Sequence, residues 1–149
     1  MRTVRLIARL DVKAPNLVKS VQLEGLRKIG DPNNFAIDYY EEGIDELYYE
    51  DIVASLYNRN SLLDVIENTT KSIFVPIIIG GGLRSVEDVS DVLRAGADKV
   101  SINSAALKNP KLLNDASNRF GSQCIVLAVD VKRTGSSWNV FSHGGSRSL

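Results

Sequence analysis

The chain has 149 residues, of which 44% are hydrophobic and 24% charged, with eighteen basic and eighteen acidic side chains. This length and composition predict one soluble globular unit. The balanced charge argues against a nucleic-acid-binding protein, which usually carries clustered excess Lys and Arg. The single cysteine, Cys124, excludes an intrachain disulfide and is expected to be a small buried hydrophobe. With no signal-peptide core and no apolar run of membrane length, a cytoplasmic protein without membrane association is expected.

Five apolar segments separated by helix signals set the expected architecture. Strands are expected at residues 4–12, 46–52, 75–79, 99–103 and 124–131, which are rich in Val, Ile and Leu. Such runs, near-continuous in the third and fifth, are typical of strands covered on both faces, as in parallel sheets. Helix starts are predicted at Asp31-Pro32, Ser61-x-x-Asp64, Ser85-x-x-Asp88 and Asn109-Pro110, and helix ends at Gly43 and Gly121. This alternation predicts an α/β protein with a parallel sheet, either doubly wound or closed into a barrel.

The strand ends decide between these two architectures. Each expected strand runs into polar or glycine residues, in chain order Asp11, Asp51, Gly80-Gly81-Gly82, Asn103-Ser104 and Asp130. A TIM-type (βα)8 barrel draws its active site from several strand ends, whereas a doubly wound sheet gathers ligand residues at one switch point. We therefore expect residues 1–149 to be a single domain with about five of eight barrel strands and the C-terminal half missing, since a whole barrel needs about 250 residues. Residues 14–30 are expected to be a long loop, and residues 134–141 a hairpin.

The glycine turn is the candidate phosphate site. Gly80-Gly81-Gly82 precedes the helix start at Ser85, and glycines let backbone N–H groups approach an anion at a helix N-terminus. The same glycines could form only a tight turn. Asn103 and Ser104, at the end of the next strand, would add side-chain donors at the same place, which favours phosphate binding.

Two aspartates are the candidate acid–base residues. Asp11 and Asp130 end the first and fifth expected strands, which lie opposite each other in an eight-stranded barrel. Two facing carboxyl groups in different protonation states suit general acid–base catalysis, although each could instead cap a segment or pair with a nearby lysine. Asp51, a third strand-end acid, is expected either to bind substrate or to have a structural role. His143, the single histidine, is expected to be a loop residue, and the lack of His and Cys clusters argues against a metal site.

Six phrases spread along nearly the whole chain carry a family resemblance. They are Leu10-Asp11-Val12-Lys13, Gly30-Asp31-Pro32, Gly43-Ile44-Asp45-Glu46-Leu47, Gly80-Gly81-Gly82, Gly96-Ala97-Asp98-Lys99-Val100-Ser101-Ile102-Asn103 and Phe120-Gly121-Ser122-Gln123. Together they resemble the N-terminal portion of the cyclase subunit of imidazole glycerol phosphate synthase, from histidine biosynthesis. The resemblance implies a cofactor-free lyase that forms a heterodimer with a glutaminase and receives ammonia from it. The ammonia is joined to a formimino-ribulosyl aminoimidazole carboxamide nucleotide, which yields imidazole glycerol phosphate and aminoimidazole carboxamide ribonucleotide.

The resemblance also implies roles for individual residues. Asp11 and Asp130 match the acid–base pair of the family. Lys19 matches a lysine of the mobile first loop, and the glycine turn at Gly82 with Asn103 and Ser104 matches a substrate phosphate site. With Gly81 of the same turn and Asp51, added for its strand-end position, the expected substrate site is Lys19, Asp51, Gly81, Gly82, Asn103 and Ser104. These assignments add roles to residues that strand-end position alone left open.

Four charged residues near strand starts gain a role from the resemblance alone. Arg5, Glu46 and Lys99 match a charged ring at the ammonia entrance, on the N-terminal face of the barrel. Asp98 lies where the glutaminase docks. Without the resemblance, all four are ordinary strand-start charges.

Two departures from the family pattern keep other interpretations open. Arg9 replaces a usually small residue, and residues 14–17 replace the usual Asp-Gly-Arg turn. The alternatives are a cyclase-like paralogue in surface-sugar amidination, the sister isomerase of the pathway, and a non-catalytic half-barrel that binds phosphate or a glutaminase. Because half of the barrel is expected to be missing, the chain by itself is expected to have little cyclase activity.

Overall fold

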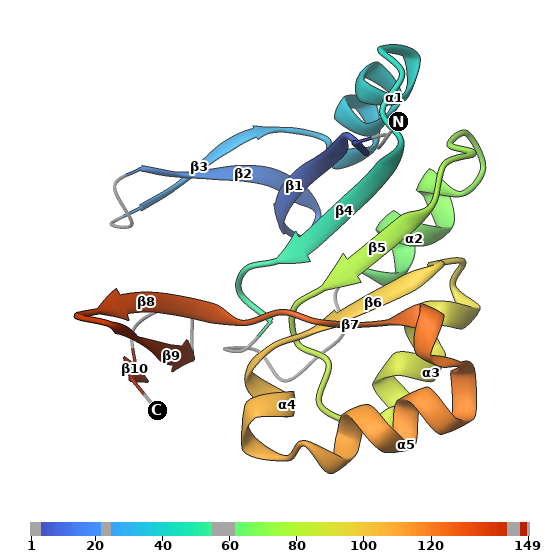
Figure 1. Cartoon of the computed structure of the whole chain (residues 1–149). Helices are drawn as coiled ribbons and strands as arrows, with labels where there is room; N and C mark the ends of the chain where they lie inside the picture. The colour runs from blue at the N-terminus through green and yellow to red at the C-terminus, as the bar shows by residue number, and fades with distance from the viewer. Residues whose placement is uncertain (1–3, 22–24, 55–61, 143–146, 149) are drawn as a thin grey trace.

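The structure, a computed structural model, describes residues 4–21, 25–54, 62–142 and 147–148 and is organised by a seven-stranded sheet (Figure 1). The strands of this sheet are β1 (Ile7–Lys13), β2 (Asn16–Val21), β3 (Gly25–Gly30), β4 (Glu46–Asp51), β5 (Ile77–Gly80), β6 (Lys99–Ile102) and β7 (Ile125–Leu127). The helices are α1 (Pro32–Glu41), α2 (Leu63–Thr69), α3 (Val86–Arg94), α4 (Ser104–Lys108) and α5 (Lys111–Phe120), and the 3-10 turn η1 (Ser122–Cys124) follows them. A smaller sheet contains β8 (Asp130–Thr134), β9 (Ser137–Ser142) and β10 (Arg147–Ser148).

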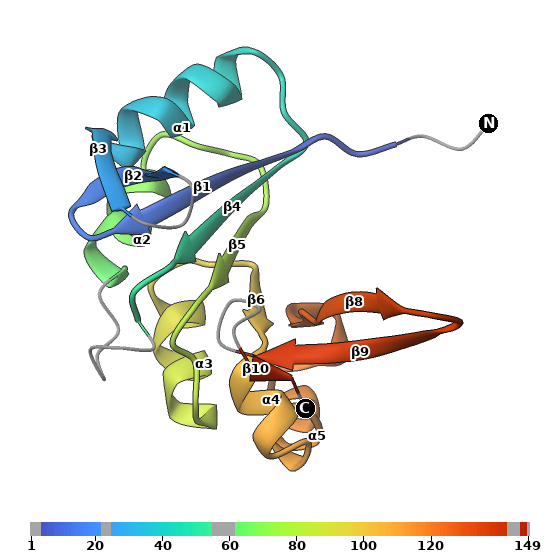
Figure 2. The ribbon, with the colours of Figure 1, turned by 90° about the vertical axis from the view of Figure 1, so that its left-hand side faces the viewer.

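The strand order of the large sheet is that of a barrel. It runs β3-β2-β1-β4-β5-β6-β7, and β1, β4, β5, β6 and β7 are parallel. Each parallel strand lies beside the next one in the chain, without the reversal of direction that creates a switch point in a doubly wound sheet. Figures 1 and 2 show this as a curved, open array of strands. The prediction of an incomplete barrel-type α/β fold is confirmed.

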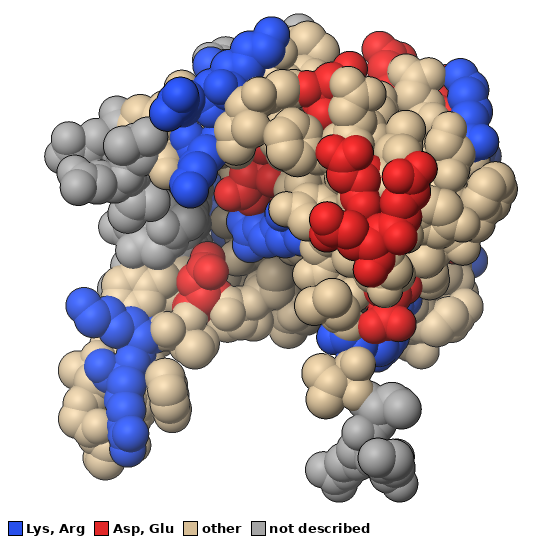
Figure 3. All heavy atoms as spheres, turned by 90° about the horizontal axis from the view of Figure 1, so that it is seen from above, with Lys and Arg blue, Asp and Glu red and all other residues tan. Residues whose placement is uncertain are grey.

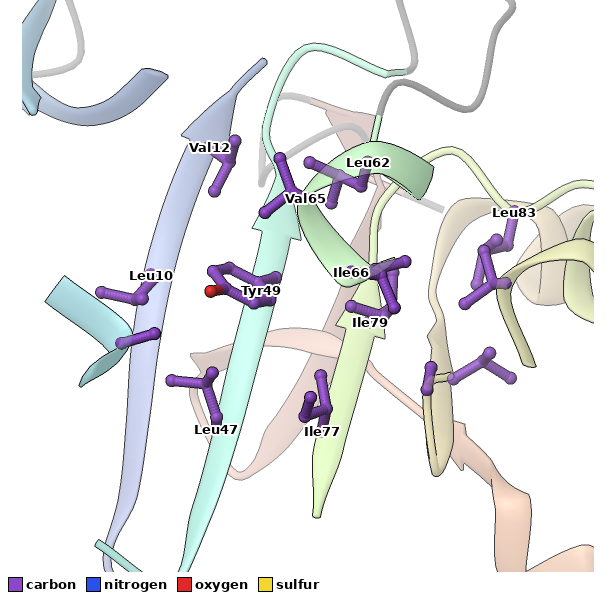
Figure 4. Packing of buried hydrophobic residues seen from close by; sticks show 14 of the residues in the cluster. Leu10, Val12, Leu47, Tyr49, Leu62, Val65, Ile66, Ile77, Ile79 and Leu83 are labelled. Atoms are coloured by element: carbon purple, nitrogen blue, oxygen red, sulfur yellow. The ribbon is translucent and has the colours of Figure 1, made fainter. Parts of the chain in front are cut away.

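The hydrophobic core lies between the sheet and the helices. Alternate strand residues point to that side, as Figure 4 shows for Leu10, Val12, Leu47, Tyr49, Ile77 and Ile79. They pack with side chains of α2 such as Val65 and Ile66. Full burial of such a side chain is worth about 1.5–3 kcal/mol, so this face supplies most of the apolar stabilisation. The opposite face of the same strands is thereby left for polar residues.

Two helix starts follow the predicted chemistry. The Asp31 side chain accepts a hydrogen bond from the Asn33 backbone N–H at 2.8 Å, with Pro32 opening α1. Ser85 and Asp88 form a reciprocal capping box at α3. Helix α2 begins after Leu62, which provides no side-chain cap, and the predicted cap Ser61 lies outside the described residues.

The remaining helix boundaries agree with prediction in part. Helix α5 begins at Lys111, just after the predicted start at Asn109-Pro110, and ends at Gly121 as predicted. Gly43 follows the end of α1, with φ +87°. The short helix α4, directly after β6, was not predicted.

The prediction of a long loop over residues 14–30 is wrong. Strands β2 and β3 form an antiparallel hairpin, and β2 pairs with β1 through Val12–Leu17 and Lys13–Asn16. The hairpin forms because Leu17 and Val18 become buried at the edge of the sheet. Lys19 is therefore a strand residue, and it is exposed.

The fifth expected strand is shorter than predicted. β7 ends at Leu127, where its pairing with Ile102 of β6 ends, and Asp130 begins β8 instead of ending the strand. Val126 and Leu127 are partly exposed, so this run is not covered on both faces. Cys124 is only partly buried, contrary to expectation. The hairpin expected at residues 134–141 is confirmed by the antiparallel pairing of β8 with β9.

Candidate functional site

The candidate site residues lie where the parallel strands end. Asp11 is in the C-terminal part of β1, Asp51 ends β4, and the glycine turn follows β5. Asn103 follows β6, and Asp130 comes three residues after β7. Because the carboxyl ends of parallel strands all lie at the same end of the sheet, the structure brings five separated segments to that end.

Asp11 and Lys19 line the same hollow. It has a volume of about 390 Å³ and lies between β1, the β2–β3 hairpin and α1. Its lining also contains apolar and aromatic groups, so the full set is Arg9, Leu10, Asp11, Leu17, Val18, Lys19, Ser20, Ile29, Phe35 and Tyr39. A hollow lined by an acidic residue, basic residues and aromatic residues could bind a polar, anionic small molecule.

Asp130 has a different neighbour. Its Oδ2 accepts a hydrogen bond from Asn103 Nδ2 at 3.0 Å. The Oδ1 atom of Asn103 is buried without a hydrogen-bond partner among the described residues. Asn103 occupies the N-cap position of α4, and Ser104 is the first residue of that helix. Asp130 is thus hydrogen-bonded to the predicted phosphate-binding segment. The expectation that Asp130 faces Asp11 stays a prediction.

The glycine turn is explained largely by packing. Gly81 and Gly82 have φ of +91° and +74°, which disfavour residues with a side chain. A Cβ at Gly81 would collide with the backbone carbonyl of Asp51, and one at Gly82 would lie 2.5 Å from Ala54 Cβ. The turn therefore packs against the segment that follows β4, and phosphate binding by its N–H groups stays a prediction.

Asp51 has a clear local role. It is buried, and its Oδ1 accepts a hydrogen bond from the Val53 backbone N–H at 3.0 Å. This bond shapes the turn after β4, against which the glycines pack. A part in substrate binding stays a prediction.

The three charged residues expected at the ammonia entrance lie at the opposite end of the sheet, where the parallel strands start. Glu46 is buried and forms ion pairs with Lys99 at 2.9 Å and with Arg5. The hydrogen bond from Lys99, and then the positive charges of Lys99 and Arg5, lower the pKa of Glu46 despite its burial. Asp98 is exposed and its Oδ2 accepts from the Ile77 backbone N–H at 2.8 Å. Arg5, which precedes β1, is thus brought together with Glu46 of β4 and Lys99 of β6, and their role at an ammonia entrance stays a prediction.

This end of the molecule is also rich in charge. Figure 3 views the chain from above, the side from which β1 and β4 start. Asp and Glu side chains gather over part of this face, and Lys and Arg side chains lie around them, near its middle and at its rim. A surface of this kind favours contact with a charge-complementary partner over burial of apolar area.

Three polar residues of the inner face were not identified from the sequence. Arg9, Tyr48 and Glu50 share one face of β1 and β4, and the Tyr48 hydroxyl donates a hydrogen bond to Glu50. Burial raises the pKa of Tyr48, with the Glu50 charge adding to it, and burial also raises the pKa of Glu50. The alternation of polar Tyr48 and Glu50 with buried Leu47 and Tyr49 was the available signal.

Two further searches concern the described part of the chain alone. None of its helices is long and apolar enough to cross a membrane. No group of three or more His, Cys, Asp or Glu side chains within it could hold a metal ion. His143 lies outside the described residues.

The fold and the strand-end residues define the class of protein: a barrel-type α/β protein with its polar site at the C-terminal strand ends. Comparison with known proteins agrees with this class. The chain belongs to the histidine biosynthesis protein family, which it matches over residues 5–149. It is 56% identical over 146 residues to imidazole glycerol phosphate synthase subunit HisF of Legionella pneumophila, covering 97% of this chain and 69% of that protein. It is 51% identical over 147 residues to subunit HisF of Myxococcus xanthus, covering 99% of this chain and 58% of that protein. It is 49% identical over 145 residues to subunit HisF of Exiguobacterium sibiricum, covering 97% of this chain and 58% of that protein. The family resemblance inferred from the six phrases is confirmed, and the chain spans less than two thirds of the length of most of these relatives.

Proposed function

We propose that the chain forms the ammonia-using cyclase part of an imidazole glycerol phosphate synthase. The observation that carries this proposal is the hollow shared by Asp11 and Lys19 between β1, the β2–β3 hairpin and α1. The identity of 46–56% to HisF subunits supports it, because it extends over nearly the whole chain. The substrate would be the formimino-ribulosyl aminoimidazole carboxamide nucleotide, and the reaction would take place in the cytoplasm.

In this proposal Asp11 and Asp130 exchange protons with the reacting groups. One carboxylate removes a proton as the ammonia nitrogen bonds to the substrate, and the other carboxyl group returns a proton to the group that leaves. The hydrogen bond from Asn103 would hold Asp130, and it would couple that acid to the segment proposed to bind a substrate phosphate. Lys19, on the β2–β3 hairpin, would supply positive charge from the other side of the hollow.

The ammonia would enter at the opposite edge. Glu46, with its two cationic partners, is proposed to form the entrance, and Asp98 to lie in the contact with a glutaminase. Support comes from the burial of Glu46 between strands, where a buried charge needs a reason beyond stability, since apolar residues often stabilise such sites equally well. The gathered acidic side chains of Figure 3 would face a partner surface of opposite charge.

Turnover and binding together test this proposal. Because the chain by itself is expected to have little activity, it would be assayed at high concentration with the nucleotide substrate and an ammonium salt. Imidazole glycerol phosphate would be quantified for wild type, Asp11→Asn and Asp130→Asn. We expect each variant to lose about 100-fold or more of the ammonia-dependent rate, as is typical when a positioned acid or base is removed. Asp115→Asn, which changes an exposed residue of α5, is the matched control and should keep the rate.

The same assay separates the proposal from a non-catalytic half-barrel. Nucleotide binding would be followed by calorimetry in parallel with product formation. Binding without turnover by the wild-type chain would favour the half-barrel. Absence of both would contradict the proposed function.

A further inference from the structure

The inner face of β1 and β4 contains a compact block of four polar residues. Arg9 and Asp11 are two positions apart on β1, and Tyr48 and Glu50 two positions apart on β4, so each pair points to one face. The parallel register aligns Arg9 with Tyr48 and Asp11 with Glu50. These four side chains therefore occupy neighbouring positions on the face opposite the hydrophobic core.

Arg9 makes two of the contacts within this block. Its Nε donates a hydrogen bond to Asp11 Oδ1 at 2.9 Å, and its guanidinium lies 5.5 Å from the centroid of the Tyr48 ring. Tyr48 in turn donates its hydroxyl hydrogen to Glu50. The planar guanidinium suits both contacts at once, because it binds a carboxylate at its edge and an aromatic ring at its face.

The contact between Arg9 and Asp11 is not explained by its contribution to folding stability. The side chains of Arg9 and Asp11 are 55% and 32% exposed, and ion pairs with such exposure contribute little to stability. Arg9 also interacts electrostatically with both Asp11 and Glu50, which are aligned on adjacent strands. Without Arg9, the like charges of Asp11 and Glu50 would repel each other across the inner face.

We propose that Arg9 is a positioning residue for Asp11. Resting on the proposed function, this inference adds that Arg9 holds Asp11 Oδ1 and, with the Tyr48 ring behind it, sets the direction of the carboxylate. The second oxygen, Oδ2, then faces the reacting group. Arg9 acts through Asp11 and does not itself exchange a proton, since a guanidinium stays charged at all relevant pH values.

Steady-state kinetics of three variants test this inference. For Arg9→Gln we expect kcat of the ammonia-dependent reaction to fall about 10- to 100-fold, the size of effect that misplacement of a catalytic group produces, with KM for the nucleotide nearly unchanged. Arg9→Lys keeps the charge and should recover part of kcat. Arg94→Gln, an exposed arginine at the end of α3, is the matched control and should behave as wild type. Equal kcat values for wild type and Arg9→Gln would overturn the inference, as would a change in KM alone.

A second measurement separates this inference from the proposed function. The Arg9 Nε–H resonance would be followed by ¹H–¹⁵N NMR in wild type and in Asp11→Asn, which needs no turnover. We expect a resonance that exchanges slowly with water in wild type and faster in Asp11→Asn. If the wild-type chain has no cyclase activity, the proposed function fails. An Nε–H resonance that Asp11→Asn leaves unchanged would then contradict the positioning role independently.

Discussion

Removing Lys99 is the sharpest test of how Glu46 is held. The Glu46 side chain is 4% exposed, while Lys99 and Arg5 are 24% and 67% exposed. A buried carboxylate that loses its cation destabilises a protein by about 3–5 kcal/mol, whereas an exposed ion pair contributes about 0–1 kcal/mol. Arg5 still contacts Glu46 in Lys99→Met, so we expect a loss of about 3 kcal/mol, at the lower end of that range. For Arg5→Met we expect less than about 1 kcal/mol.

Urea unfolding at pH 7, followed by circular dichroism, measures these differences. A third variant, Glu46→Leu with Lys99→Met, replaces both charges by apolar groups and should lie within about 1 kcal/mol of wild type. Equal losses in the two single variants would refute the reasoning, because burial would then not decide the cost. A double variant as unstable as Lys99→Met would refute it as well.

The pH dependence of folding stability tests the same ion pairs, and the direction of the expected change follows from the pKa of Glu46. Lys99 and Arg5 lower the pKa of Glu46 in the folded chain below its ordinary value of 4.5. The stabilisation is therefore fully present above pH 4.5 and is lost as the pH falls through the lower, folded pKa. We expect the difference between wild type and Lys99→Met to stay constant between about pH 5 and 7 and to shrink below about pH 4.

Three further substitutions test the packing around the candidate site. Ser85→Ala removes the side-chain cap of α3 and should cost about 1 kcal/mol in urea unfolding. Tyr49→Phe removes the buried 2.8 Å hydrogen bond between the Tyr49 hydroxyl and Thr69 Oγ1. It should cost about 1–2 kcal/mol, because Thr69 keeps other partners. Gly81→Ala places a methyl group against the Asp51 carbonyl at φ +91° and should cost more than about 2 kcal/mol, measured as a drop in the thermal midpoint.

Each substitution has a control within the chain. Gly43 has φ +87° with no atom within 4 Å of an added Cβ, so Gly43→Ala should cost only about 1–2 kcal/mol, from backbone strain. Equal losses at Gly43 and Gly81 would contradict the packing argument. Ser90→Ala, within α3, leaves the cap intact, and a loss there equal to that of Ser85→Ala would contradict the capping argument. A Tyr49→Phe variant as stable as wild type would show that the hydroxyl contributes nothing.

Much of the fold could be predicted because its signals are local. Apolar runs such as Ile77–Gly80 identify strands, and Asp31, Ser85 and Gly121 mark helix boundaries through hydrogen bonds to nearby backbone groups. The β2–β3 hairpin had no such signal. Its strands pair with near neighbours in the sequence, as Lys13 does with Asn16, but most of their residues are exposed, so no apolar pattern marks them as strands.

Some residues of the candidate site could likewise be identified from the sequence, and others could not. Asp11 was identified because a lone carboxylate at the end of an apolar strand is unusual, and Glu46 and Lys99 entered through the family resemblance. The contact of Arg9 with the Tyr48 ring, the bond between Asn103 and Asp130, and the burial of Glu46 depend on which strands lie side by side. Strand neighbours are chosen by the whole core, so these contacts were not predictable from spacing.

By itself, the sequence determined the strand–helix alternation, the caps at Asp31 and Ser85, and the acids Asp11 and Asp51 near strand ends, because each rests on residues within a few positions of one another. Only the tertiary structure decided that Asp11 shares a hollow with Lys19, that Arg9 lies over the Tyr48 ring, and that the glycine turn packs against Asp51. The physical reason is that these arrangements require strand register, and register is set by burial of the complete helix-covered face.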